Sequence, residues 1–411
     1  MADPAPTVLT GVYAVVRDLL QRSYGLFPDE LVPVMSELVE QHTGATHLEL
    51  LLVDLDQREL RGLGRAGHEG SSYPILESAP GLAFRDEVPV AQPIDGRRQL
   101  WLPVLDSAER LGVLGLVDDS SASIDDWLVL SSLVGELVMA KQDYGDHIAI
   151  ARRREPVTLA AEMRWAMLPP LMFSSPRVCV AGILQPSHLV AGDAFDYAVG
   201  DNTALVGIFD AVGHDLQASR VANLVVGGFR SGRRRGLTVV ETLTMIDDTV
   251  TVELGQNRFA TAQVVELDLS AGVARIHTAG HPPPVHLRMS GPPEIVEVQP
   301  GRPLGLGPSE YVETTVQLEP GDALLLHSDG IYEARSPDGE DYGWDRMIDL
   351  AQALFAVETR PPEVLRQVIH DAIDFQGDDI RDDATLAMVR WQPSIVGIPS
   401  APRAENAIFL D

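Results

Sequence analysis

The C-terminal part of this chain consists of short apolar runs that end at glycine or aspartate, and this pattern constrains the fold more than any other feature. Such runs, bounded by turn residues, predict buried strands. The predicted strands are Val178–Leu184, Ala204–Phe209, Ala260–Leu269, Val273–Ala279, Val312–Leu318, Ala323–His327 and Thr385–Trp391. Apolar side chains at helical spacing predict helices at Asp215–Arg230, Val239–Leu254, Met347–Phe355 and Pro362–Phe375. We therefore expect one domain over residues 171–392, followed by a flexible tail over residues 393–411.

The N-terminal part has a different order of elements. Helical patterns come first, apolar strand-like runs follow, and a further helical pattern closes the segment. The predicted helices are Val8–Tyr24, Leu31–His42 and Ile124–Ala140, and the strand-like runs are His47–Asp54, Leu60–Leu63, Gln99–Leu105 and Leu111–Asp118. This order predicts a small α+β domain over residues 1–140.

Residues 141–170 are predicted to form a helical linker between the two domains. Apolar residues recur at four-residue spacing along it and would form one stripe. These residues are Leu159, Met163 and Met167. A helix that joins two domains can transmit a rotation, although a plain spacer, with Arg152–Arg154 as a solvated face, is the alternative.

Charge and cysteine content exclude several classes of partner. The chain has 60 acidic and 31 basic residues and a formal net charge of −29, which repels nucleic acids and anionic membranes. Cys179 is the sole cysteine, so an internal disulfide and a cysteine-rich zinc site are excluded. No apolar run reaches the roughly 18 residues of a membrane-spanning helix, and the N-terminus lacks the pattern of a signal peptide. We expect a cytoplasmic protein.

Aspartates lie beside three of the predicted strands and in a further β-rich stretch, Ala191–Asp196. They are Asp193, Asp210, Asp329 and the pair Asp382–Asp383. A single aspartate beside a strand is usually a turn or cap residue, but neighbouring strands would bring these carboxylates together. Clustered carboxylates repel one another unless cations neutralise them. Oxygen ligands without a cysteine or histidine cluster favour Mg²⁺ or Mn²⁺, and two such ions could activate a water and orient a phosphate.

The order of the motifs in this part resembles the SpoIIE/RsbU branch of the PPM (PP2C-type) protein serine/threonine phosphatases. The segments that carry the resemblance are Trp165–Pro169, Ala191–Asp196, Asp210–Asp215, Phe259–Thr261, Ala279–Pro283, Arg302–Gly305, Gly321–Ala334, Tyr342–Gly343 and Asp382–Thr385. In the N-terminal part, Leu100–Leu105 and Leu111–Leu116 resemble the last hairpin of a GAF sensor domain, although any half-buried hairpin has a similar pattern.

The phosphatase resemblance implies an αββα sandwich of two antiparallel sheets flanked by helices, with two Mn²⁺ or Mg²⁺ ions at one edge. The ligands that it implies are the carboxylates of Asp193, Asp210, Asp329 and Asp382 and the carbonyl of Ala211, with Asp383 as the alternative to Asp382. No protein nucleophile is implied. A water activated by the two metals would attack phosphoserine or phosphothreonine in line.

The chain departs from the family pattern at Ala191, Asp215 and Ser328. Ser328 keeps the hydroxyl of the usual threonine. Asp215 replaces a glycine and would either cap the following helix or weaken the approach of phosphate. His214 is either a proton donor to the leaving oxygen or a turn residue, and His281 is expected to be structural.

The resemblance makes a metal-dependent protein phosphatase the leading function. Its expected substrate is a phosphorylated anti-sigma-factor antagonist in a partner-switching pathway, and its N-terminal domain would receive an unknown signal. A metal-dependent nuclease is disfavoured by the negative charge, and a non-catalytic scaffold with a degenerate phosphatase fold is the alternative. A homodimer is possible through apolar residues that could instead pack within the N-terminal domain. These residues are Leu130, Leu133, Leu137 and Met139–Ala140.

Overall fold

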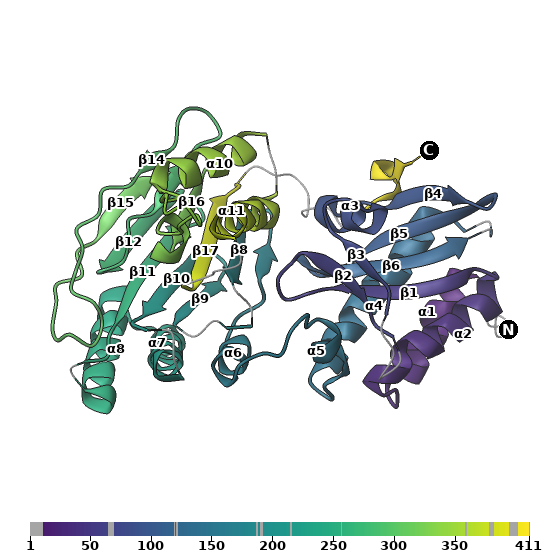
Figure 1. Cartoon of the computed structure of the whole chain (residues 1–411), viewed down its shortest axis with the longest axis horizontal. Coiled ribbons are helices and arrows are strands. Elements are labelled where there is room, and N and C mark those ends of the chain that lie inside the picture. The colour runs from purple at the N-terminus through teal and green to yellow at the C-terminus, as the bar shows by residue number, and fades with distance from the viewer. Residues whose placement is uncertain are drawn as a thin grey trace, which may run out of the picture. The chain divides into compact units, whose positions relative to one another are not determined.

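The computed structural model of the chain divides into two compact units (Figure 1). Unit 1 comprises Met1–Arg154 together with Ser400–Asp411, and unit 2 comprises Glu155–Pro399. The structure describes residues 11–64, 70–118, 120, 122–185, 188–189, 192–213, 216–255, 257–357, 360–377, 382–393 and 402–410. No helix in these described ranges is long and apolar enough to cross a membrane.

Unit 1 is an α+β domain built on one sheet with the strand order β18-β4-β5-β6-β1-β2-β3. Its strands are β1 (Thr46–Val53), β2 (Glu59–Gly62), β3 (Ser72–Pro74), β4 (Val90–Ile94), β5 (Arg97–Asp106), β6 (Glu109–Asp118) and β18 (Ile408–Phe409). Its α-helices are α1 (Val12–Ser23), α2 (Leu31–Thr43), α3 (Ala79–Asp86), α4 (Ile124–Gln142) and α5 (His147–Ala151). Short 3₁₀ turns lie at Pro28–Glu30 and Ala404–Asn406.

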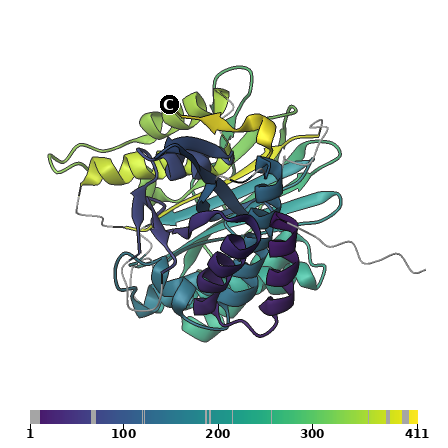
Figure 2. The same cartoon turned by 90° about the vertical axis from the view of Figure 1, so that its right-hand side faces the viewer.

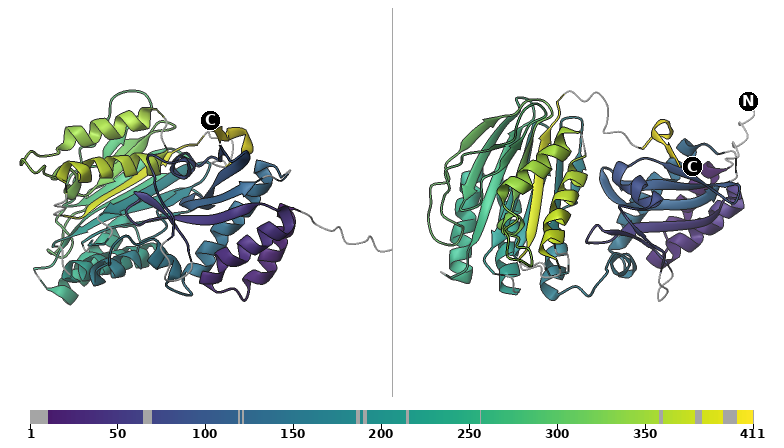
Figure 3. Two further views of the ribbon diagram at one scale, coloured as in Figure 1. Left: turned by 45° about the vertical axis from the view of Figure 1, so that its right-hand side comes forward. Right: turned by 45° about the horizontal axis from the view of Figure 1, so that its top comes forward.

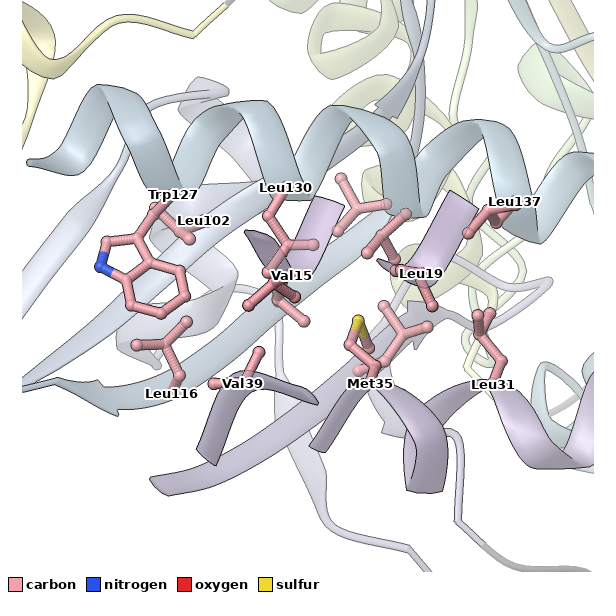
Figure 4. Packing of buried hydrophobic residues seen from close by; sticks show 14 of the residues in the cluster. Val15, Leu19, Leu31, Met35, Val39, Leu102, Leu116, Trp127, Leu130 and Leu137 are labelled. Carbon is pink, nitrogen blue, oxygen red and sulfur yellow. The ribbon is translucent and has the colours of Figure 1, made fainter. Parts of the chain in front are cut away.

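The core of unit 1 lies between the sheet and the helices α1, α2 and α4. Figure 2 shows α1 and α2 in purple, side by side. Figure 4 shows Val15 of α1, Met35 of α2 and Trp127 of α4 in one buried cluster with Leu102 and Leu116 of the sheet. Alternate strand residues point to the opposite face, where α3 covers a second cluster. The sheet is therefore buried on both faces.

Unit 2 contains two sheets, in which every strand pair is antiparallel. The first sheet has the order β15-β12-β11-β10-β9 and the second β14-β13-β16-β17-β8-β7. The strands are β7 (Met172–Ser174), β8 (Val178–Gln185), β9 (Asp193–Val199), β10 (Thr203–Ala211), β11 (Ala260–Asp268), β12 (Val273–Ala279), β13 (Val285–Leu287), β14 (Glu294–Ile295), β15 (Thr314–Gln317), β16 (Ala323–His327) and β17 (Ala384–Trp391). The helices are α6 (Leu159–Trp165), α7 (Leu216–Arg234), α8 (Val239–Leu254), α9 (Asp329–Tyr332), α10 (Trp344–Ala356) and α11 (Pro361–Gln376).

The two sheets of unit 2 stack face to face with helices outside. Phe195, Ile208 and Leu324 belong to the apolar cluster between the sheets. A second cluster joins α7 and α8 to the outer face of the first sheet, and a third joins α10 and α11 to the outer face of the second. Figure 3 shows α10 and α11 lying over the sheet that contains β17. The predicted α+β class and the sandwich of two antiparallel sheets flanked by helices are confirmed.

The predicted helical linker over residues 141–170 is helical only in part, and its break lies around Pro156. Helix α5 ends at Ala151 and α6 begins at Leu159, so seven residues that include Pro156 separate them, as the missing N–H of proline favours. Arg152 is not on a solvated face either, because its Nε donates a hydrogen bond of 3.0 Å to the Val53 carbonyl in unit 1. The predicted apolar stripe is also broken, since Leu159 is 65% exposed.

Two further predictions about unit 1 fail. The tail is not loose over its described part, because Ile408 and Phe409 form β18, which pairs in parallel with β4. The backbone amides of Ile408 and Leu410 donate to the carbonyls of Pro89 and Ala91 and so cover that sheet edge. The suggested dimer face does not exist at Leu130 and Leu137, since both side chains lie in the core beneath α4. The alternative, packing within the domain, describes them.

Candidate metal centre

Strand pairing brings the predicted aspartates to one end of the sandwich. Asp193 opens β9 and lies directly opposite Asp210 near the end of β10. In the second sheet, Asp329 begins α9 immediately after β16, and Asp382–Asp383 immediately precede β17. Strands β16 and β17 are neighbours, and the Ser328 amide donates to the Thr385 carbonyl at 3.0 Å. The first sheet therefore contributes Asp193 and Asp210 to this end, and the second contributes Asp329 and the pair Asp382–Asp383.

Strand alternation directs Asp193 and Asp210 toward the space between the sheets. Side chains at every second residue of a strand share a face. Phe195, two residues after Asp193, and Ile208, two residues before Asp210, both belong to the core between the sheets. Asp196, by contrast, points to the helical layer, where Arg230 and Arg233 bind its carboxylate at 3.0 and 2.6 Å.

Asp383 links the two sheets at the site. Its Oδ2 accepts hydrogen bonds from the backbone amides of Gly192, at 2.7 Å, and Asp193, at 3.2 Å. Its side chain is buried, whereas Asp382 is exposed and accepts a bond of 2.9 Å from the Asp383 amide. Between these neighbours, Asp383 is thus engaged with the protein and Asp382 faces solvent.

The carboxylates disfavour one another's ionisation. Burial, together with Asp210 and Asp383, raises the pKa of Asp193 well above its ordinary value. Burial and the charges of Asp329, Asp382 and Asp383 raise the pKa of Asp210 to about 7. Burial and Asp382 also raise the pKa of Asp329. Such mutual shifts are the mark of like charges gathered in a poorly solvated place.

The donor set fits hard divalent cations. Asp193 Oδ2 is buried and accepts no hydrogen bond from any residue that the structure describes. Carboxylate oxygens are the ligands that Mg²⁺ and Mn²⁺ prefer, and a cation would relieve the repulsion that raises these pKa values. Within the described ranges no three acidic, histidine or cysteine side chains form a closed ligand group.

Gly192 allows the main chain to close around the site. A Cβ at this position would lie 2.6 Å from the Ala211 carbonyl oxygen and 2.9 Å from that of Gly213. The predicted ligand Ala211 is held next to Gly192 by the bond of 3.2 Å that its amide donates to the Gly192 carbonyl. Any larger residue at position 192 would displace the strand end that carries Asp210 and Ala211.

His281 is structural, as expected. Burial and the neighbouring His327 lower the pKa of His281 to about 3, so the ring is neutral. Its Nε2 lies 3.0 Å from the His327 carbonyl, which can only accept, so Nε2 donates there. Nδ1 then accepts from the Thr261 hydroxyl at 2.7 Å. Because Thr261 pairs with Asp210 across the sheet, these hydrogen bonds hold in place the part of β11 that lies beside Asp210.

Three of the residues discussed from the sequence, Ala191, His214 and Asp215, lie outside the described residues. The structure adds one residue that sequence reasoning missed. Arg164 on α6 is fully buried, and the charges of Asp383 and Asp193 oppose the effect of burial on its pKa. An arginine on a short helix between apolar residues gives no sequence signal of such a position.

Comparison with known proteins identifies relatives of unit 2. Residues 200–392 match the family model described as Stage II sporulation protein E (SpoIIE). Protein IcfG of Synechocystis sp. is 25% identical over 236 residues, which cover 49% of this chain and 36% of IcfG. The phosphoserine phosphatase RsbU of Bacillus subtilis is 19% identical over 240 residues, covering 58% of this chain and 70% of RsbU. The chain thus spans about a third of IcfG.

Among solved structures, one comprising RsbU and RsbW domains from Mycobacterium tuberculosis is similar to this chain. The two sequences are 26% identical. The match covers 53% of this chain and 61% of the solved chain, with a TM-score of 0.47.

Proposed function

We propose that the SpoIIE-type phosphatase domain formed by residues 200–392, together with the strand that carries Asp193, makes this protein a metal-dependent protein serine/threonine phosphatase. The observation that carries the proposal is the gathering of aspartates from both sheets at one end of the sandwich. The raised pKa values of these aspartates reflect burial and the repulsion between their negative charges, which bound cations would relieve.

Five of the predicted groups would hold two ions. Asp193, Asp210 and the carbonyl of Ala211 would hold one ion, and Asp329 and Asp382 the other. Asp383 is better suited to bracing the site than to binding a metal, because its Oδ2 already accepts two backbone hydrogen bonds. Bound Mn²⁺ or Mg²⁺ would lower the pKa of a water and neutralise charge on the phosphate.

The chain's own residues organise this centre. Ser328, which is fully buried, accepts a bond of 2.9 Å from the Thr385 amide through its hydroxyl oxygen, and this bond ties the start of α9 to the start of β17. Gly330 permits the same approach, because a side chain there would collide with the Asp383 carbonyl. These contacts hold the start of α9, where Asp329 lies, next to the start of β17, which Asp382 precedes. A phosphoryl group would therefore meet a preorganised site.

The name of one relative supports the proposed substrate class. RsbU is named a phosphoserine phosphatase, and the substrate proposed here is a phosphoserine or phosphothreonine of a regulatory protein, in particular an anti-sigma-factor antagonist. Unit 1, an α+β domain that we propose to be a GAF-like sensor, would receive the regulatory signal. A groove of about 550 Å³ lies between α6, α7 and α8, and Met163, Asn223 and Leu254 are among its lining residues.

Hydrolysis of a phosphoserine peptide and of p-nitrophenyl phosphate by the full chain tests the proposal. We expect turnover with Mn²⁺ or Mg²⁺, none in excess chelator, and none with Asp210→Asn. Asp201→Asn is the matched control, since Asp201 is exposed in the turn at the other end of the β9–β10 hairpin. Metal binding without hydrolysis of either substrate would refute the phosphatase and favour the non-catalytic scaffold.

A further inference from the structure

The edge strand of unit 1 is covered by a segment from the other end of the chain. Residues 403–410 follow unit 2 in the sequence but belong to unit 1, where β18 pairs with β4 at the end of the sheet (Figure 1). The Ile408 amide donates to the Pro89 carbonyl at 2.8 Å, and the Leu410 amide donates to the Ala91 carbonyl at 2.8 Å. The edge of a sheet offers such backbone groups to any extended segment.

Side-chain contacts make this pairing selective. Ile408 and Leu410 both pack against the apolar cluster that α3 covers, which includes Val90 of β4. Phe409, between them, is 68% exposed, because successive side chains of a strand point to opposite sides. The edge of β4 therefore selects aliphatic side chains two residues apart and makes little use of the side chain between them.

A second anchor lies upstream of β18. The Ala404 amide donates a hydrogen bond of 3.0 Å to Oδ1 of Asp125, which lies in the first turn of α4. Ala404 and Ala407 pack against the cluster on the other face of the sheet, between the sheet and α4. Residues 403–410 thus wrap around the edge of the sheet, and contacts on both faces set their register.

This segment lies on the surface and is not part of the core. Each residue from 402 to 410 is half-buried or exposed, and none is buried. Every buried member of the two clusters lies within residues 12–148, so the core of unit 1 is complete without the segment. A segment that is held only by surface contacts can open and close locally while the rest of the domain stays folded.

We propose that the edge of β4 is a peptide-docking site of unit 1, which the chain's own residues 403–410 occupy and which a partner protein enters by displacing them. The partner's segment is extended, carries aliphatic side chains two residues apart, and donates their amides to the carbonyls of Pro89 and Ala91. This is the addition of a strand to a sheet edge, with the chain's own segment as the template for the chemistry. The inference goes beyond the proposed function, since it concerns unit 1 and needs neither a metal nor phosphatase activity.

Fluorescence anisotropy with a labelled peptide of residues 402–410 tests the proposal on the full chain. The receptor is the double variant Ile408→Asp/Leu410→Asp, which releases the chain's own segment because aspartates are unfavourable against an apolar cluster. We expect this variant to bind the peptide saturably. The parent should bind it at least about tenfold more weakly, because its tethered segment competes at an effective concentration in the roughly millimolar range.

Two controls separate strand addition from other binding. Phe409→Asp introduces the same charge at the exposed position, so the segment stays docked and the peptide affinity should equal that of the parent. A peptide methylated at the Ile408 amide nitrogen keeps its side chains but cannot donate to Pro89. It should bind the double variant several-fold more weakly than the unmodified peptide.

Equal affinity of the peptide for parent and double variant, or binding to neither, would overturn the inference. Undiminished binding of the methylated peptide would also overturn it. Hydrogen exchange in the parent supplies a measurement that needs no variant, in case the double variant does not fold. The amides of Ile408 and Leu410 should exchange at least about tenfold faster than those of β5 and β6, and equal protection would show that β18 is an integral strand and would overturn the proposal.

Discussion

Asp210→Asn should stabilise the metal-free protein at alkaline pH, although it destroys the proposed metal centre. Ionised Asp210 is held in the folded state against burial and against the charges of Asp329, Asp382 and Asp383. In the unfolded chain it ionises freely. An asparagine has nearly the same shape and never carries this charge, so the variant is spared the repulsion.

The size of the effect follows from the pKa. Burial and the neighbouring carboxylates raise the pKa of Asp210 from 3.8 to about 7, and a shift of this size is worth about 4 kcal/mol. Because the folded-state pKa is the higher one, the favourable contribution is fully present below about pH 4 and is lost as the pH rises to about 7. At pH 8 the metal-free variant should therefore melt on the order of 10 °C above the parent.

Thermal melts of unit 2 in the full chain, between pH 4 and 8, provide the assay. In chelator, the two proteins should melt together near pH 4 and diverge as the pH rises. In saturating Mn²⁺ the order should reverse at pH 8, because ligand binding stabilises only the folded state that can bind it. A parent and variant that keep a constant difference across the pH range would refute the electrostatic reasoning.

Asp196→Asn is the matched control for this experiment. Asp196 lies on β9 three residues from Asp193, but Arg230 and Arg233 neutralise it. Removing one partner of a buried ion pair leaves the other charge uncompensated and costs about 3–5 kcal/mol. Asp196→Asn should therefore melt below the parent at pH 8, with and without Mn²⁺.

The remaining predictions concern three other positions. Gly192→Ala should lower both the melting temperature and the Mn²⁺ affinity, because the new Cβ would lie 2.6 Å from the Ala211 carbonyl oxygen. Thermal melts and Mn²⁺ titration measure the two effects, and an unchanged affinity would contradict the close approach. Met163→Asp places a charge in the groove beside Asn223 and Leu254. It should change phosphatase turnover several-fold and leave the Mn²⁺ affinity nearly unaltered. Equal turnover of variant and parent would show that α6 does not influence catalysis. Asp215→Gly should raise kcat/KM if Asp215 repels phosphate, or leave it unchanged and lower stability by a few tenths of a kcal/mol if it only caps a helix.

The resemblance to a known phosphatase family predicted the sandwich, whereas local signals predicted its longer strands and the aspartates. The longer strands of unit 2, such as β8, β10 and β17, are apolar runs bounded by turn residues, and Asp210, Asp329 and Asp382–Asp383 stand where such runs begin or end. Convergence of the aspartates then required that β9 and β10 pair through a short hairpin connection. It also required that β16 and β17 pair although three helices, α9, α10 and α11, separate them in the chain.

The linker and the tail could not be predicted in the same way. Pro156 indicates a break in the helical pattern, but the sequence does not show that α5 ends as early as Ala151, next to which Arg152 bonds to the Val53 carbonyl. Strand β18 is just two residues long, and it exists because β4 offers an edge to pair with. Both outcomes depend on contacts between residues far apart in the chain, which periodicity does not encode.

Two aspartates of strand β9 differ in their electrostatic surroundings, because one is neutralised within the protein and the other is not. Asp193 and Asp196 are both fully or nearly fully buried, and an odd spacing along a strand sends them to opposite faces. Asp196 meets two arginines of α7 and is neutralised within the protein. Asp193 meets Asp210 and Asp383 instead, with Arg164 as a partial counter-charge, so its negative charge remains in excess. A buried carboxylate in excess needs a proton or a cation, and in the proposed metal centre the neighbouring carbonyl and carboxylate oxygens would make that partner a divalent cation.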